Sequence, residues 1–175
     1  MLENVLPLLT LAIPLMTSPG PATVSLAATG SAFGVRGGLP YLAGTLVGNS
    51  AVLLMIATGI TGLILALPAA IPVLTTVGLA YLLYLAWKIA TAPAVRSDGV
   101  AGAAPSLDGG FLLSLVNPKA YAAIGAVYAS GSIVPGDPIL DTALKLAVLT
   151  GVNGTGNTTW LALEQITTRW KHPVV

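Results

Sequence analysis

The chain has 175 residues, of which 55% are hydrophobic and only 7% are charged, and its formal net charge is +1. A soluble domain carries about 25% charged residues, so this composition excludes an ordinary water-soluble protein and indicates an integral membrane protein. The small net charge offers no basic surface for a nucleic acid. The chain has no cysteine, which excludes disulfides and thiolate metal sites.

Five stretches are apolar enough to cross a membrane as helices, which takes about 20 residues each. They cover residues 5–29, 39–67, 71–91, 109–134 and 139–163. We interpret the first as a retained helix and not a cleaved signal peptide, because Glu3 stands where a basic segment is expected. We predict one transmembrane domain over residues 1–175, with a polar linker at residues 92–108 between its two halves.

The first predicted span is interrupted by Ser18-Pro19-Gly20-Pro21. Proline has no backbone N–H and clashes with the preceding helical turn, so this stretch cannot continue a regular helix. In lipid the freed carbonyl groups must find partners inside the protein. A break at membrane depth therefore favours a substrate or ion site, and the alternative is a purely structural kink.

Glycines dominate the region after the first span. We predict a loop there that contains Gly30, Gly34, Arg36, Gly37 and Gly38. The second span carries Gly44 and Gly48, a pair of small residues four apart that lets another helix approach closely. Asn49 follows directly and is a candidate binding residue, with a packing hydrogen bond between helices as the alternative.

A second break, Asn117-Pro118-Lys119, lies in the fourth predicted span. Lys119 is the only charge in the central third of any predicted span, and an intramembrane cation is a functional-site hypothesis by default. The alternative is a lysine whose side chain extends to the membrane interface. In the fifth span, Asn153 and Asn157 share one helical face. They either bind a substrate or form hydrogen bonds with a neighbouring helix.

The distribution of charges predicts the orientation of the chain. If all five stretches span, the cationic regions around Arg36, residues 88–96 and residues 169–171 share one side, and Glu3, Asp137 and Asp141 fall on the other. The positive-inside rule then places the N-terminus outside and the C-terminus in the cytoplasm. Asp141 and Lys145 are four residues apart, which permits an ion pair.

The same orientation gives the two breaks a common depth. At a rise of 1.5 Å per residue, each break lies about 15 Å from the inner face, near the middle of a hydrocarbon core about 30 Å thick. Matched breaks in the first and fourth spans predict an inverted repeat of three helices. The predicted fold is therefore an all-α integral membrane protein with five transmembrane helices, the first and fourth of them broken.

Four blocks of sequence carry a family resemblance: Pro19-Gly20-Pro21, the spaced glycines from Gly30 to Gly48, the segment Gly78 to Lys88, and Asn117-Pro118-Lys119-Ala120. In this order and spacing, over about residues 15–130, the chain resembles the lysine-exporter (LysE/RhtB) family. The resemblance implies a secondary transporter of the bacterial inner membrane that exports amino acids or related small metabolites. It also implies six helices, whereas five are predicted here.

We therefore expect a substrate site where the two breaks meet. Lys119 would bind a substrate carboxylate or hold a cytoplasmic gate. The freed carbonyl groups before Pro19, together with the Asn117 side chain, would accept hydrogen bonds from the substrate's ammonium. The positive end of the half-helix after Pro21 also suits a carboxylate. The predicted substrate-binding residues are Pro19, Gly20, Pro21, Asn49, Asn117, Pro118, Lys119 and Asn153.

Several other expectations complete the prediction. The partners are a small-molecule substrate and the lipid bilayer, with a second copy of the chain left open, and no nucleic acid, cofactor, metal or catalytic residue is expected. A metal exporter lacks a cluster of ligands, and an enzyme lacks a nucleophile beside a base in any span. The alternative function is that of a truncated or degenerate family member with an assembly role and no independent transport.

Overall fold

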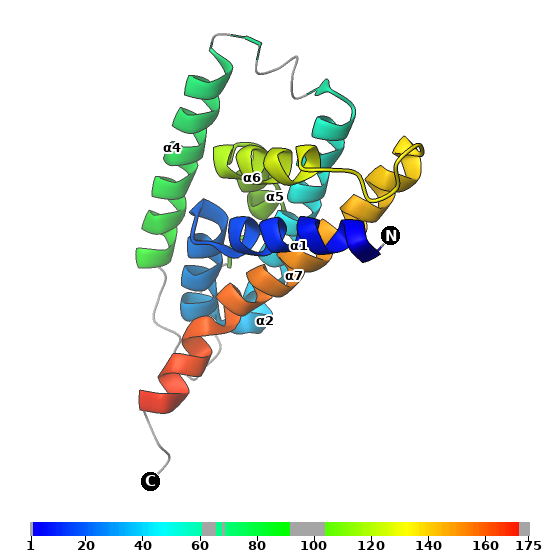
Figure 1. Ribbon diagram of the computed structural model, residues 1–175. Coiled ribbons are helices and arrows are strands. Elements are labelled where there is room, and N and C mark those ends of the chain that lie inside the picture. Colours follow the sequence, from blue (N-terminus) through cyan, green and yellow to red (C-terminus); the bar gives the residue numbers. More distant parts are fainter. Residues whose placement is uncertain (1, 61–65, 68, 92–103, 172–175) are drawn as a thin grey trace.

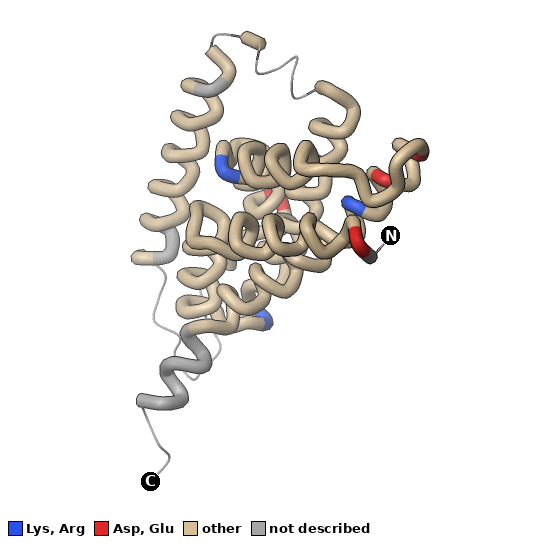
Figure 2. Tube along the Cα trace, in the orientation of Figure 1, with Lys and Arg blue, Asp and Glu red and all other residues tan. Residues whose placement is uncertain are grey.

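The computed structural model describes residues 2–60, 66–67, 69–91 and 104–171, and within these residues all regular structure is helical (Figure 1). This confirms the all-α class. The helices are α1 (Leu2–Thr17), α2 (Pro21–Ala57), α4 (Ala70–Ala90), α5 (Leu107–Leu115), α6 (Pro118–Ala129) and α7 (Pro138–Lys171). Charged residues are sparse over the described helices, and most of the acidic ones lie at one end, near the N-terminus (Figure 2).

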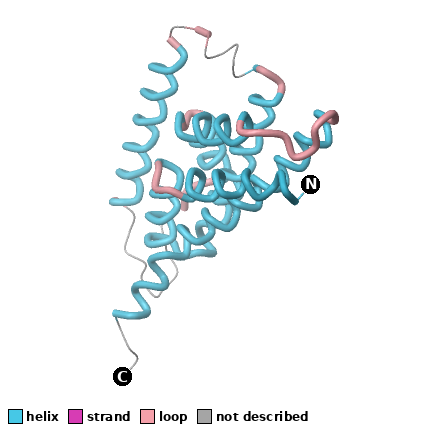
Figure 3. Tube along the Cα trace, viewed as in Figure 1, coloured by secondary structure: helices cyan, strands magenta, loops and turns pink. Residues whose placement is uncertain are grey.

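Both predicted breaks are present (Figure 3). α1 ends at Thr17 and α2 begins at Pro21, while α5 ends at Leu115 and α6 begins at Pro118 with a bend of 66°. In each case proline occupies the first helical position, where its missing N–H leaves no helical hydrogen bond unmade. The two breaks therefore share the same local design, a helix that begins at a proline, although almost one hundred residues separate them in the chain.

The predicted glycine loop at residues 30–38 is wrong, because α2 continues through this region and only Gly34 leaves the helical conformation, at φ 71° and ψ 169°. The chain nevertheless reverses direction at Gly34. The hydroxyl oxygens of Ser25 and Tyr41 lie 3.0 Å apart, whereas sixteen residues of straight helix would separate them by about 24 Å. Thus α2 consists of two segments, residues 21–33 and 35–57, that pack against each other.

The glycines on either side of Gly34 serve packing, which is why they do not form a loop. A methyl group on Gly30 would lie 1.9 Å from the Leu161 carbonyl oxygen, and one on Gly38 would lie 2.4 Å from Leu161 Cδ1. Only glycine fits these positions without displacing α7, which packs directly against them. The sequence alone does not distinguish a glycine that allows close helix packing from a glycine that allows a turn.

The pair Gly44 and Gly48 confirms the predicted close approach of a helix. A methyl group on Gly44 would lie 2.0 Å from the Leu107 carbonyl oxygen, and one on Gly48 would lie 2.5 Å from Ser114 Cβ. Both contacts belong to α5, whose Ser114 hydroxyl also donates to the Thr45 carbonyl oxygen at 3.1 Å. The segment 35–57 therefore forms the centre of the molecule, between α5 on one side and α7 on another.

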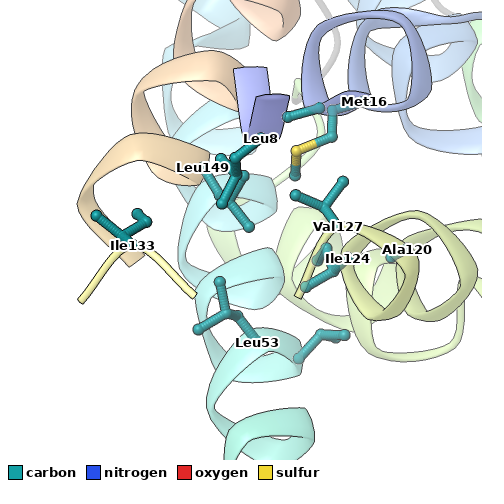
Figure 4. Close-up of a cluster of buried hydrophobic side chains, with 10 residues drawn as sticks. Leu8, Met16, Leu53, Ala120, Ile124, Val127, Ile133 and Leu149 are labelled. Atoms are coloured by element: carbon teal, nitrogen blue, oxygen red, sulfur yellow. The ribbon is translucent and has the colours of Figure 1, made fainter. Parts of the chain in front are cut away.

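Two clusters of buried apolar side chains hold the half-helices in place. The first joins four helices, α1, α2, α6 and α7 (Figure 4), through Leu8, Met16, Leu53, Ala120, Ile124, Val127 and Leu149 among others. The second lies around Tyr41 and Leu113 and includes Leu26, Leu85 and Leu161. Since lipid is as apolar as these side chains, close packing and not hydrophobic burial favours this arrangement in a membrane.

Length and composition identify fewer spans than the sequence predicted. Among the described residues, α2 alone is long and apolar enough to cross a membrane, and the bent pair α5 and α6 qualifies if it is taken as one span. The five-span count and the inverted repeat stay predictions. Most of the predicted linker, residues 92–103, lies outside the described residues. Tyr84 and Trp87 near the end of α4 are exposed, and aromatic residues at the end of a membrane helix are typical of an interfacial belt.

Candidate functional site

A small cavity of about 30 Å³ lies where the two breaks meet. Five of the eight predicted binding residues line it, and they come from α2, α6, α7 and the first break: Gly20, Asn49, Asn117, Lys119 and Asn153. Thr23 and Asn157 join them, and Leu15, Met16, Ala22, Ala120, Ala123 and Ile124 complete the wall. Folding thus brings together polar residues that are up to 134 positions apart.

The prolines occupy different positions from the polar residues. Pro19 is exposed and does not line this cavity. Pro21 and Pro118 line a second cavity of about 190 Å³ on the α4 side of the breaks, whose other walls are largely apolar. Asn117 borders both cavities. The prolines therefore shape the breaks, and the residues next to them supply the polar groups.

Lys119 connects the two breaks directly. Its Nζ donates to the carbonyl oxygen of Ser18 and, at 3.3 Å, to that of Pro19. The Ser18 carbonyl is one of those that we predicted to accept hydrogen bonds from a substrate's ammonium. In the folded chain it accepts one from the Lys119 ammonium instead. The side chain passes over Gly20, where a methyl group would lie 2.5 Å from Lys119 Cδ.

The remaining polar groups at the end of α1 also find partners within the protein. Trp160 Nε1 donates to the Thr17 carbonyl oxygen at 2.9 Å, and the Ser18 hydroxyl donates to the Leu15 carbonyl oxygen at 3.0 Å. This is the internal pairing that a break at membrane depth requires. Sequence reasoning missed Trp160, although a tryptophan within an apolar helix needs an acceptor for its N–H.

Side-chain oxygens accept hydrogen bonds from backbone N–H groups at the starts of α2 and α6. The backbone N–H of Gly20 donates to Thr23 Oγ1 at 2.7 Å, and Asn117 Oδ1 accepts from the backbone N–H of Lys119 at 3.1 Å. Asn117 therefore acts as a helix cap, which leaves its oxygen less available to a substrate than predicted. The positive end of the α2 helix dipole and the Lys119 ammonium both border the cavity.

Three buried asparagines line the side of the cavity away from Lys119's own helix. Asn157 Nδ2 lies 3.5 Å from Thr45 Oγ1, and Asn153 Nδ2 lies 3.9 Å from Met16 Sδ, so both contacts are long. Asn49 Oδ1 is buried and has no hydrogen-bond partner among the described residues. An unpaired buried acceptor costs about 1–3 kcal/mol, so this oxygen has a strong preference for a donor within the cavity.

The predicted ion pair between Asp141 and Lys145 is confirmed, with 2.9 Å between Lys145 Nζ and Asp141 Oδ2. Asp141 Oδ1 also accepts from the backbone N–H of Ile133 at 2.6 Å, and Lys145 Nζ donates to the Tyr128 carbonyl oxygen at 3.0 Å. Neither charged residue lines the cavity at the breaks. The pair joins the turn after α6 to the start of α7.

The polar groups around the breaks match the charges of a small zwitterion. One ammonium and one positive helix end suit a carboxylate, and amide oxygens suit an ammonium. No acidic side chain from the described residues lines the cavity. A substrate with an additional positive charge would therefore find no compensating group there.

Residues 13–173 match the family described as LysE type translocator. The cysteine/O-acetylserine efflux protein of Escherichia coli strain K12 is 33% identical over 144 residues, which cover 82% of this chain and 73% of that protein. Proteins of the same name from Shigella flexneri and Shigella sonnei strain Ss046 match with the same identity and coverage. No solved structure matches the chain. With most of its length matched in this way, the chain belongs to the LysE type translocator family.

Proposed function

We propose that this protein is a secondary transporter that exports small neutral amino acids or their derivatives, of the cysteine and O-acetylserine type, across the bacterial inner membrane. The observation that carries the proposal is the cavity between the two breaks, which gathers Lys119 and four asparagines in an otherwise apolar setting. The relatives named as cysteine/O-acetylserine efflux proteins suggest the substrate class.

In this proposal the substrate's carboxylate binds beside Lys119 and the start of the 21–33 half-helix. Its ammonium binds the amide oxygens on the opposite wall. The short side chain of the substrate lies against Met16, Ala123 and Ile124. The neutral lining favours a zwitterion over a cationic amino acid, because an extra buried charge without a partner is costly.

We also propose the membrane arrangement that the sequence predicts, with five spans in an inverted repeat, the N-terminus outside and the C-terminus in the cytoplasm. One contact supports it. Asn4 Nδ2 donates to the Ile133 carbonyl oxygen at 3.1 Å, which brings the acidic N-terminal end close to the turn that precedes Asp137 and Asp141. The acidic residues that the positive-inside rule assigns to the outer side therefore gather at one end.

An export assay tests the function. Cells that express the wild-type chain should release more O-acetylserine and tolerate more of it than cells that carry an empty vector. Lys119→Gln should lower export by about 10-fold or more at equal membrane abundance, since hydrogen bonds to charged groups contribute about 1.5–3 kcal/mol.

Lys88→Gln is the matched control. Lys88 follows Trp87 near the end of an apolar helix, where a lysine side chain typically extends to the membrane interface, so its loss should leave export unchanged. A wild-type chain that is abundant in the membrane yet changes neither export nor tolerance would contradict the proposal. That result would favour the assembly role without transport.

A further inference from the structure

The apolar cavity on the α4 side of the breaks has no part in the proposed transport. Its volume is about 190 Å³, and its walls come from α4, from α5 and from the residues at which the two half-helices begin. An apolar cavity stays free of water, because water finds too few hydrogen-bond partners in it. Apart from Thr75 and Asn117, the lining residues have no polar side-chain atom: Pro21, Gly78, Leu79, Leu82, Leu113, Val116 and Pro118.

The cavity lies directly beside a close contact between α4 and the second break. α4 runs along one edge of the molecule (Figure 1), and a methyl group on Gly78 would lie 2.8 Å from the Val116 carbonyl oxygen. Both of these residues also line the cavity. If the space beside the contact were empty, its walls would lack van der Waals partners on one side. The cavity therefore favours an apolar occupant.

The cavity opens to the outer surface of the helices. Thr75, Leu79 and Pro118 line it and are exposed, and Leu79 is 56% accessible. On the inner wall, by contrast, Leu113 is fully buried. Two of the exposed residues lie within α4 and the third lies at the second break, which is predicted to stand near the middle of the bilayer. At that depth an opening to the side faces lipid tails.

We propose that this cavity binds an acyl chain of a membrane phospholipid, which enters between α4 and the second break and packs against Pro21 and Pro118. A methylene chain suits these walls because it is apolar and needs no hydrogen bond. Lipid tails are as apolar as the walls, so close packing favours the bound chain. The bilayer also supplies acyl chains at a very high concentration, so weak binding is enough to fill the site. This inference concerns a lipid and does not depend on the exported substrate.

Photolabelling in vesicles tests the site. The wild-type chain is reconstituted into phosphatidylethanolamine and phosphatidylglycerol that contain a phosphatidylethanolamine with a diazirine in the middle of one acyl chain. After illumination, mass spectrometry should find adducts on Leu113 and Val116, which form the wall opposite α4. Leu82→Trp fills the cavity from α4 and should lower this yield about fivefold or more, because the larger ring takes the space of the acyl chain.

Leu83→Trp is the matched control, because Leu83 is exposed, does not line the cavity and should leave the adduct yield unchanged. If Leu82→Trp does not reach the membrane, Val116→Phe fills the cavity from the opposite wall, and adducts are then measured on Leu113. Absence of adducts on both wall residues of the wild-type chain would overturn the proposal. An equal yield in the filled variant and the control would overturn it too.

A second copy of the chain is the competing occupant. Thr75 lies at the opening, and the absence of native cysteine allows disulfide trapping with Thr75→Cys. With an acyl chain in the cavity, this variant should stay monomeric under oxidising conditions in the same vesicles. Disulfide-linked dimers that form while Leu113 and Val116 stay unlabelled would show a neighbouring chain at the cavity and would overturn the lipid site.

Discussion

Lys119 and Gly20 form the most specific contact at the scale of single residues. The lysine side chain needs an open path to the carbonyl groups of Ser18 and Pro19, and only a residue without a Cβ leaves that path free. The sequence marked both residues as candidates, each within its own break. It could not reveal that they meet, because about one hundred residues separate them and no local pattern encodes such a contact.

Gly20→Ala should therefore impair transport more than stability. The added methyl would lie 2.5 Å from Lys119 Cδ, and the flexible lysine would move away from the carbonyl groups instead of distorting the helices. We expect export to fall by about an order of magnitude, as one or two charge-assisted hydrogen bonds are lost, with little change in the melting temperature. Gly131→Ala, where a methyl group meets nothing within 4 Å, is the control. Equal export by the two variants would contradict this account of Lys119.

At the scale of elements, the close approach of α7 to α2 depends on Gly30. A methyl group there would lie 1.9 Å from a backbone oxygen, which cannot move without displacing α7. Gly30→Ala should lower the free energy of unfolding by about 1–3 kcal/mol. Gly151→Ala, on an open face of α7, should leave it unchanged or raise it by up to about 1 kcal/mol. Thermal unfolding in detergent compares them, and similar melting temperatures would show that the two helices do not pack this closely.

The reversal inside α2 depends on the backbone conformation of Gly34. Its φ of 71° with ψ of 169° lies in a region that only glycine occupies readily, at a cost of about 1–3 kcal/mol for other residues. Gly34→Ala and Gly34→Asn should both destabilise the protein. Asparagine tolerates the left-handed helical region but gains nothing at this ψ. A clear rescue by asparagine in thermal unfolding would show that the turn has a different geometry.

At the scale of the whole molecule, the sequence predicted the helical class, both breaks, the close approach at Gly44 and Gly48, and the Asp141–Lys145 pair. These depend on local rules of proline, glycine and charge spacing. It failed at residues 30–38, where glycines that pack against α7 looked like a loop. For the site, it identified residues by type and spacing, but Trp160 and Thr23 act through contacts that only the folded chain creates.

The Asp141–Lys145 ion pair links the turn after α6 to the start of α7, at the end of the molecule where most acidic residues lie. Asp141→Asn leaves Lys145 buried without its counter-charge, and loss of one partner of such a pair typically costs about 3–5 kcal/mol. We expect a matching fall in thermal stability, and the double variant Asp141→Asn with Lys145→Met should recover part of it. Export per folded molecule should stay near the wild-type value, because neither residue lines the cavity at the breaks. A double variant that is less stable than Asp141→Asn would contradict this view of the pair.

The bond between Lys119 and the first break also bears on the concentration at which the transporter begins to work. In the proposed site, a substrate carboxylate would compete with the Ser18 and Pro19 carbonyl groups for the Lys119 ammonium, so part of its binding free energy would go into releasing the lysine. The apparent affinity is weakened accordingly. Under the proposed function, export should therefore begin at a higher substrate concentration than it would with a free lysine.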